Sequence, residues 1–379
     1  MNLIRTLAGP LLPVLILASS LVAAPAFAAN TNNYEAHTLV SDGGVPADNR
    51  DSNLKNGWGV AFNPNGFVWV ADNHAGVATL YDGFGKPSPQ PTPLVVTIPA
   101  APGQAQGSPT GIVFNGSADF VVANGGKSGP SRFIFASEDG VISGWAPNVD
   151  FTNAIPVPSA TTADAVYKGL ALAANGTANM LYAADFHGGK IDVFNASFAP
   201  TSVPGGFRDR GIPADFAPFN IMNIGGYLYV AFAKREAGGD DEVAGQGLGF
   251  VDVFDPNGNL INRVATRGKL NAPWGMAMAP AGFGKFSGRL LVGNFGDGTI
   301  NAYDVATGEF RGQLRTPEHR VLKIDGLWGL AFGNGLFNQP TNSLFFAAGP
   351  NGEENGAYGR IVAVPPRGKQ DDGDGGDDD

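Results

Sequence analysis

Short apolar runs separated by glycine-rich turns dominate the hydrophobic pattern of this 379-residue chain. Leu270–Asp304 shows the pattern most clearly: an apolar run follows Trp274-Gly275, a second lies at Leu290–Gly293 and a third at Thr299–Tyr303. Runs of about four to seven residues, rich in Val, Ile, Phe and Tyr and bounded by Gly, Asn and Asp, are typical of β-strands. No window longer than about ten residues shows the period of an amphipathic helix. The pattern therefore predicts an all-β protein.

The same three-strand pattern recurs along the chain at a nearly fixed period. Its anchors are Trp58-Gly59, Thr110-Gly111, Lys168-Gly169, Asn220-Ile221, Trp274-Gly275 and Trp328-Gly329, which are 52, 58, 52, 54 and 54 residues apart. Strands this short cannot bury both faces alone, so each unit must stack on its neighbours. Six such units predict a six-bladed β-propeller. Leucine-rich and hexapeptide solenoids are excluded because their repeats are far shorter.

Two strand assignments follow from the ends of the repeat. Tyr34–Val40 reads as a strand without a blade of its own, whereas the last unit, Trp328–Val364, has only three strands. We therefore expect the N-terminal strand to join the last blade and close the ring, which removes the open strand edges. Inner strands crowd near the propeller axis, so we also expect close backbone approach at Gly275 and Gly329.

The N-terminus has the features of a secretory signal peptide. Arg5 precedes an apolar stretch, Leu11–Ala24, and Ala26-Phe27-Ala28 is a small-residue cleavage site. The alternative is a membrane anchor, but this stretch is shorter than the ~20 residues that a span needs. The predicted organisation is a signal peptide at 1–28, a propeller at 29–365 and an acidic disordered tail at 366–379, with no membrane span after cleavage.

Composition limits the cellular compartments and the classes of partner that we expect. The chain has no cysteine, and a large repeat core does not need disulfides, so predicted export favours a bacterial periplasm or exterior. The net charge is −10, which excludes nucleic acid as an expected partner because neutralising phosphates needs a basic surface. The tail Asp371–Asp379 lacks the spacing of a calcium loop, so we expect it to be solvated. We expect a monomer.

Parts of the repeat resemble known propellers. Phe67–Asp72 and Leu181–Asp185 are similar to the second strand of NHL-type repeats. The span Tyr34–Val364 as a whole resembles an uncharacterised family of exported bacterial six-bladed propellers. That resemblance rests on Asn271–Gly275, Leu291–Gly298, Ala217–Asn220 and Leu327–Leu330. The resemblance implies the fold and export of the protein, but it identifies no catalytic residue. Some members of that family end in a sorting helix, and here an acidic tail stands in its place.

One end of the propeller is the predicted binding face. In antiparallel blades, the start of the first strand and the turn between the second and third strands fall at the same end, and function usually lies on loops that a rigid scaffold positions. The candidate ligand-binding residues at this end are Trp58, Trp274, Trp328, Lys168, Asn220, His74 and His187. Each has a structural alternative. The tryptophans would plug the channel, and the two histidines would reflect repeat ancestry. The blade-four insert, with Asp240-Asp241-Glu242, would be a solvated loop.

Two functions stay open at this point. The first is a binding or scaffold protein that holds a ligand, glycan, peptide or partner protein. The second is a calcium-assisted hydrolase or lyase of the lactonase type, an analogy of fold alone. Its candidate metal ligands are the side-chain oxygens of Asp72, Asp185, Asn220 and Asn294, which suit Ca²⁺. The two aspartates would otherwise accept hydrogen bonds from turn amides. The chain has no H-E-x-x-H, P-loop, G-x-S-x-G or thiol nucleophile, so binding is the favoured function.

Overall fold

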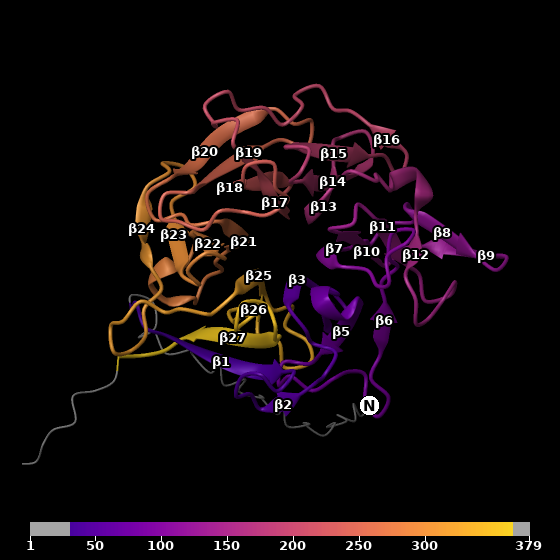
Figure 1. Ribbon diagram of the computed structural model, residues 1–379. Helices are drawn as coiled ribbons and strands as arrows, with labels where there is room; N and C mark the ends of the chain where they lie inside the picture. Colours follow the sequence, from indigo (N-terminus) through magenta and orange to yellow (C-terminus); the bar gives the residue numbers. More distant parts are fainter. Residues whose placement is uncertain (1–30, 367–379) are drawn as a thin grey trace, which may run out of the picture.

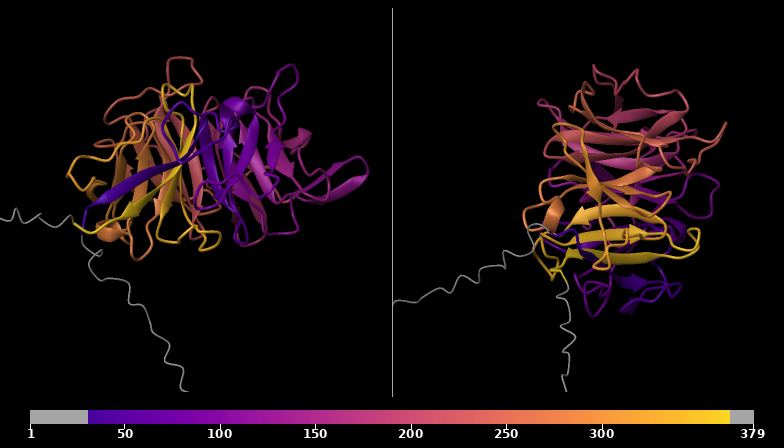
Figure 2. Two further views of the ribbon diagram at one scale, coloured as in Figure 1. Left: turned by 90° about the horizontal axis from the view of Figure 1, so that it is seen from below. Right: turned by 90° about the vertical axis from the view of Figure 1, so that its left-hand side faces the viewer.

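Six mainly antiparallel sheets stand in a ring around a central channel in this computed structural model, which describes residues 31–366 (Figure 1). Each sheet begins with an inner strand beside the channel and continues outward to the rim. Seen edge-on, the strands run between two loop-bearing faces (Figure 2). The predicted all-β, six-bladed propeller is confirmed.

The first three blades take up the N-terminal half of the ring. Blade one consists of β3 (Gly57–Phe62), β4 (Val68–Asp72), β5 (Val77–Tyr81) and β6 (Val95–Thr97). Blade two consists of β7 (Pro109–Phe114), β10 (Phe133–Ser137), β11 (Ile142–Trp145) and β12 (Ile155–Pro156). Blade three consists of β13 (Tyr167–Ala174), β14 (Asn179–Asp185), β15 (Lys190–Phe194) and β16 (Pro200–Thr201).

The other three blades complete the ring. Blade four consists of β17 (Phe216–Ile224), β18 (Tyr227–Lys234), β19 (Gly249–Phe254) and β20 (Leu260–Thr266). Blade five consists of β21 (Pro273–Met278), β22 (Leu290–Asn294), β23 (Ile300–Tyr303) and β24 (Phe310–Gln313). Blade six consists of β25 (Leu327–Phe332), β26 (Leu344–Ala348), β27 (Ala357–Ala363), β1 (Tyr34–Ser41) and β2 (Asn49–Arg50). Short 3-10 helices lie at Asn73–Ala75, Pro158–Ala160 and Gly284–Phe286.

The N-terminal strand closes the ring as the sequence predicts. β1 pairs antiparallel with β27, from Tyr34 opposite Ala363 to Ser41 opposite Ala357. The buried Tyr34 hydroxyl also donates to the Phe283 carbonyl of blade five at 3.0 Å. The two ends of the described chain are thereby held in one sheet.

Apolar side chains fill the wedges between neighbouring blades. Tyr81 of blade one stacks on Tyr358 of blade six at 5.3 Å between ring centroids, and Trp69 of blade one stacks on Phe133 of blade two at 4.2 Å. Alternating strand positions thus bury apolar faces between blades, which is why the short strands need their neighbours.

A β-bulge lies at the anchor of every repeat. In blade one the pairing shifts between Gly57 and Val60, so Trp58 and Gly59 together stand opposite Ala71. Equivalent shifts occur in the first strand of each other blade. A bulge re-aims a side chain, and here it directs one residue per blade toward the channel: Trp58, Thr110, Lys168, Phe219, Trp274 and Trp328.

The bulges bring the inner strands into close backbone contact. A Cβ on Gly275 would lie 2.4 Å from the Trp328 carbonyl oxygen of the next blade, and one on Gly329 would lie 2.4 Å from the Trp58 carbonyl oxygen. Only glycine fits there, as the sequence predicts.

The predicted anchor of blade four is wrong by one residue. The extra residue of that bulge is Phe219, and Asn220 occupies the glycine position of the repeat. Instead of making a bare backbone contact, the Asn220 side chain donates from Nδ2 to the Trp274 carbonyl at 2.8 Å. The hydrogen bond from the Asn220 side chain thus takes the place of the close backbone contact that a glycine makes in the other blades. The apolar pattern of the sequence does not reveal this substitution.

Blade two carries an additional hairpin at its rim. The hairpin consists of β8 (Val121–Asn124) and β9 (Lys127–Pro130), which project outward in Figure 1. Gly125 and Gly126 make the two-residue turn with φ of 55° and 77°, values that favour glycine.

The predicted signal peptide (1–28) and the acidic tail from residue 367 lie outside the described residues. Within residues 31–366, no helix is long and apolar enough to cross a membrane.

Candidate functional site

Three bulge tryptophans close the channel near one end. Trp58 stacks on Trp328 with 3.6 Å between ring centroids, and Trp274 meets both edge-on at 6.0 and 5.6 Å. Their exposed fractions are 3% for Trp58, 4% for Trp274 and 1% for Trp328. The structural interpretation of the tryptophans as a channel plug is therefore confirmed, and the plug forms the floor of the site.

Lys168, the bulge residue of blade three, lies on this floor with only 2% of its surface exposed. Its ammonium is 5.4 Å from the ring centroid of Phe186 and 5.7 Å from those of Trp58 and Phe219. Aromatic faces attract a cation, but a buried ammonium also needs neutralising charge.

Three carboxylates supply that charge. Lys168 Nζ lies 3.1 Å from Asp241 Oδ1, 3.3 Å from Glu242 Oε2 and 3.6 Å from Glu138 Oε1. Burial alone would lower the pKa of Lys168, but the three carboxylates outweigh that effect and raise its pKa above the usual value. Burial raises the pKa of Glu138 and of Glu242, and Lys168 only partly opposes the rise.

A polar cavity of about 290 Å³ opens above Lys168 at the channel mouth. Its lining residues come from blades one, two, three and six and from the blade-four insert: Asn56, Trp58, Asn73, His74, Glu138, Lys168, Asp241, Glu242, Trp328 and Glu353. We call this cavity the mouth pocket.

Hydrogen bonds fix the carboxylates of the mouth pocket. Asn73 donates to Glu138 Oε2 at 2.9 Å. Glu353 Oε1 accepts from Asn56 Nδ2 at 3.0 Å and from the Trp328 indole at 3.2 Å. Side chains held in this way are pre-organised to bind a ligand.

The blade-four insert is exposed, as the solvated-loop interpretation expects, with 56% of the Asp240 side chain and 75% of the Asp241 side chain accessible, but it is also tied to blade three. Asp241 and Glu242 reach across to Lys168 of blade three, and Asp240 Oδ1 lies 2.5 Å from His187 Nδ1. The insert is tied to blade three because consecutive acidic residues meet basic residues that are far away in the sequence.

Two proteins of a giant virus align with most of this chain. The uncharacterized protein R648 of Acanthamoeba polyphaga mimivirus is 33% identical over 336 residues, covering 86% of this chain and 80% of that protein. The uncharacterized protein L690 of the same virus is 34% identical over 340 residues, covering 87% and 86%. The chain belongs to the family of these proteins. No family model matches the chain.

Solved structures similar to this member of the R648/L690 family support the fold. A structural genomics protein of unknown function from Bacteroides thetaiotaomicron aligns with a TM-score of 0.52 and 13% identity, covering 87% of this chain and 76% of that one. A streptogramin B lyase structure aligns with a TM-score of 0.46 and 12% identity, covering 87% and 97%. The first likeness shows the fold alone, and the second is too weak to bear on function.

The relatives of this family member are viral, so they give no support to the expected bacterial origin. The likeness to NHL-type repeats also stays a prediction, since it rests on two short strand motifs only.

The structure brings together only part of the predicted ligand-binding set. Trp58, Trp328, Lys168 and His74 line the mouth pocket. Trp274 lies beneath it, and its indole donates to the Lys168 carbonyl at 2.8 Å.

Two of the predicted ligand-binding residues lie elsewhere. Asn220 lines a small void of about 30 Å³, away from the mouth pocket. His187 lines a different hollow between blades three and four. Repeat position alone therefore does not bring these side chains to the mouth pocket.

Three of the four predicted metal ligands, Asn294, Asn220 and Asp185, are engaged in separate local networks. Asn294 donates to the Lys269 carbonyl at 2.8 Å, and Asn220 bonds the Trp274 carbonyl. Asp185 accepts turn amides, as its structural alternative predicts, whereas Asp72 is fully buried. Residues 31–366 contain no group of three or more His, Asp or Glu that could hold a metal ion. The calcium site stays a prediction.

The sequence analysis missed six lining residues of the mouth pocket as ligand candidates: Asn56, Asn73, Glu138, Asp241, Glu242 and Glu353. Glu138 and Glu353 lie in the turns between the second and third strands of their blades, so the rule that selected His74 could have found them. Glu242 could not be found, because its place depends on how the insert folds back over blade three.

Proposed function

We propose that this protein is an exported binding protein that holds a polyhydroxylated ligand, such as one sugar unit of a glycan, in the mouth pocket. The observation that carries the proposal is the buried Lys168 ammonium beneath an open cavity walled by carboxylates and amides. Buried charges with shifted pKa values cluster at functional sites.

The mixture of charges in the mouth pocket favours a neutral polar ligand. A simple anion would be repelled by the four carboxylates of the lining, and the Lys168 ammonium already lies within 3.6 Å of three of them, where a simple cation would otherwise bind. A hydroxyl group both donates and accepts hydrogen bonds, so it can use the carboxylates as acceptors and the ammonium as a donor. The Trp58 indole N–H, buried beside the cavity, also has no acceptor among the described residues.

The proposed site is accessible as well as polar. The side chain of Glu138 is 29% exposed and that of Asp241 is 75% exposed, although both face the buried Lys168. A ligand can therefore reach the carboxylate oxygens that do not contact the ammonium. The calcium-assisted hydrolase or lyase has no comparable observation in its favour.

The test is calorimetry and tryptophan fluorescence on the full chain with a panel of neutral monosaccharides. We expect at least one sugar to bind and to change the emission of Trp58 or Trp328. The E138Q variant should bind it at least ~10-fold more weakly, because a hydrogen bond to a charged group contributes about 1.5–3 kcal/mol.

The matched control is E309Q, which changes an exposed glutamate of blade five that pairs with Arg311 and should bind as the wild type does. Binding of spermidine or Ca²⁺ in the mouth pocket, without binding of any neutral sugar, would contradict the proposal. Equal loss of sugar binding in E138Q and E309Q would contradict it as well.

A further inference from the structure

A second hollow lies at the junction of blades three and four and is rich in arginine. It has a volume of about 410 Å³, and its lining includes Arg208, Arg210 and Arg235. Arg208 and Arg210 belong to the loop between β16 and β17, and Arg235 follows β18 directly. We call it the arginine hollow.

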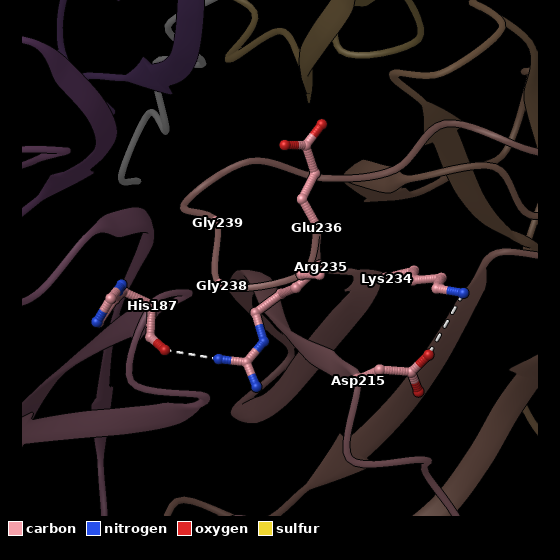
Figure 3. A pocket seen from close by; sticks show the side chains of 8 residues that line it. His187, Asp215, Lys234, Arg235, Glu236, Gly238 and Gly239 are labelled. Carbon is pink, nitrogen blue, oxygen red and sulfur yellow. Dashed lines mark hydrogen bonds and ion pairs between the residues drawn. The ribbon is translucent and has the colours of Figure 1, made fainter.

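Arg235 joins the arginine hollow to a neighbouring depression of about 550 Å³, shown in Figure 3. Its Nη1 donates to the His187 carbonyl at 2.6 Å and its Nη2 to the Ala214 carbonyl at 3.2 Å. Lys234 turns away toward Asp215, 3.5 Å off, and Glu236 points away from the guanidinium (Figure 3). The guanidinium is thus held in place by neutral carbonyls while its charge stays unneutralised.

The other two arginines also lack a counter-ion. Neither Arg208 nor Arg210 forms an ion pair with any residue in the 31–366 range. The lining of the arginine hollow contains a single carboxylate, Asp209, and that group is bound to Arg263 and to the Gly211 amide. Burial would raise the pKa of Asp209, but the Gly211 amide and Arg263 lower it below the usual value, so Asp209 is ionised and already paired.

Three like charges line one hollow, and an anion bound among them would be attracted by all three. This local excess of positive charge stands out in a chain whose net charge is −10. Arginine also presents a planar fork of donors that matches carboxylate, sulfate and phosphate oxygens.

The loop that carries two of the arginines is anchored rather than free. The Phe207 ring packs against Tyr182 at 5.6 Å and Phe254 at 5.3 Å, and the Phe207 amide donates to the Gly258 carbonyl at 3.0 Å. Arg208 and Arg210 follow this anchor directly, so the charges are positioned before a ligand arrives.

The remaining lining of the arginine hollow is apolar. Phe207, Phe216 and Phe232 are nearly buried in the core and form its base, so the accessible apolar surface is mainly that of Ile212 and Pro213. A small inorganic ion would leave this surface unused, whereas an anion attached to a ring or hydrocarbon would cover it.

We propose that the arginine hollow is a binding site for an oxyanion carried on an apolar or aromatic body. Arg208, Arg210 and Arg235 hold the anionic group, and the apolar surface around Ile212 and Pro213 holds the body. The site is separate from the mouth pocket and does not depend on the function proposed for it.

Calorimetry on the full chain with phenyl phosphate, phenyl sulfate and phenylacetate tests the site. We expect at least one of the three to bind, and their ranking identifies the oxyanion. Inorganic phosphate has the oxyanion without the ring, and benzyl alcohol has the ring without the oxyanion. Each should bind at least tenfold more weakly. Binding should also weaken as KCl is raised, because salt screens the attraction.

The R208Q and R210Q variants should each weaken binding at least tenfold. Both side chains are exposed and unpaired within the described range, so neither change should lower the melting temperature. The control R320Q removes an exposed arginine that lies in the segment before β25 and has no ion pair in residues 31–366, and it should bind like the wild type.

Binding that survives in R208Q and R210Q would overturn the proposal. So would an equal loss in R320Q, because the affinity would then reflect overall charge rather than a built site. The E138Q variant of the mouth pocket should leave phenyl phosphate binding unchanged, so the two proposals can fail separately.

Discussion

Blades one and three carry the same short motif in two different environments. Asp72–Gly76 and Asp185–Gly189 both begin with Asp at the end of the second strand and contain His two residues later. The strand register is also the same, since Asp72 stands opposite Val77 and Asp185 opposite Lys190. Only blade three therefore places a cation across from its aspartate.

The consequences for the two carboxylates are opposite. Asp185 accepts hydrogen bonds from the Gly188 amide at 2.9 Å and the Val166 amide at 3.2 Å, and lies 3.3 Å from Lys190 Nζ. Asp72 has no exposed surface, so burial raises its pKa well above the ordinary value, and hydrogen bonding from Thr79 opposes the rise only in part.

The histidines of the two motifs diverge as well. His74 lines the mouth pocket, whereas His187 pairs with Asp240 at the junction of blades three and four. A shared repeat position thus fixes where a residue lies in its blade, but the neighbouring blade decides what the residue does.

The largest expected effect comes from D185A. It removes the acceptor of two backbone amides and one partner of Lys190, so we expect the free energy of unfolding to fall by about 3 kcal/mol. Urea denaturation measures the loss. D72A removes a buried carboxylate that has no ion pair among residues 31–366 and whose burial is itself unfavourable, so it should cost much less. Equal losses in the two variants would show that the comparison is wrong.

The pH dependence of stability sharpens the comparison at Asp72. Because its folded-state pKa lies above the ordinary 3.8, the folded protein keeps a proton that the unfolded chain releases. This group's contribution to the free energy of unfolding therefore falls as the pH rises above 3.8. The D72N variant has no such proton to lose, so it should be more stable than the wild type at neutral pH.

Thermal denaturation from about pH 4 to pH 7 measures this difference, which should grow steadily as the pH rises. A difference between D72N and the wild type that stays constant across this range would mean that Asp72 does not titrate as its burial indicates.

The smallest expected effect is that of calcium on the protein freed of metal with a chelator. A ligand that binds only the folded state raises the melting temperature, but the oxygens of Asp185 are already occupied and those of Asp72 are enclosed. We expect a shift of less than about 1 °C, near the resolution of the method. A larger rise that D72A or D185A abolishes would instead support the calcium site.

The sequence by itself determined the fold and its closure. The lengths of the apolar runs and the turns between them are local properties of the sequence. The number of times this pattern recurs, from Trp58 to Trp328, gives the number of blades. Tyr34–Val40 is a strand without a blade, and the last unit lacks an outer strand. Pairing the two closes the ring and covers a strand edge that would otherwise stay open. The close approach at Gly275 and Gly329 follows from the same geometry.

Only the tertiary structure decided which side chains form a site. Lys168 meets Glu242 across 74 positions of sequence, and the arginine hollow gathers charges from a loop and from the end of a strand. These contacts depend on bulge geometry and on the path of the blade-four insert, which no local pattern encodes. Charged groups pair with residues that are near in space but distant in sequence, whereas the hydrophobic pattern is read along the chain. The sequence therefore predicts the propeller, and only the folded molecule shows which side chains form the pockets.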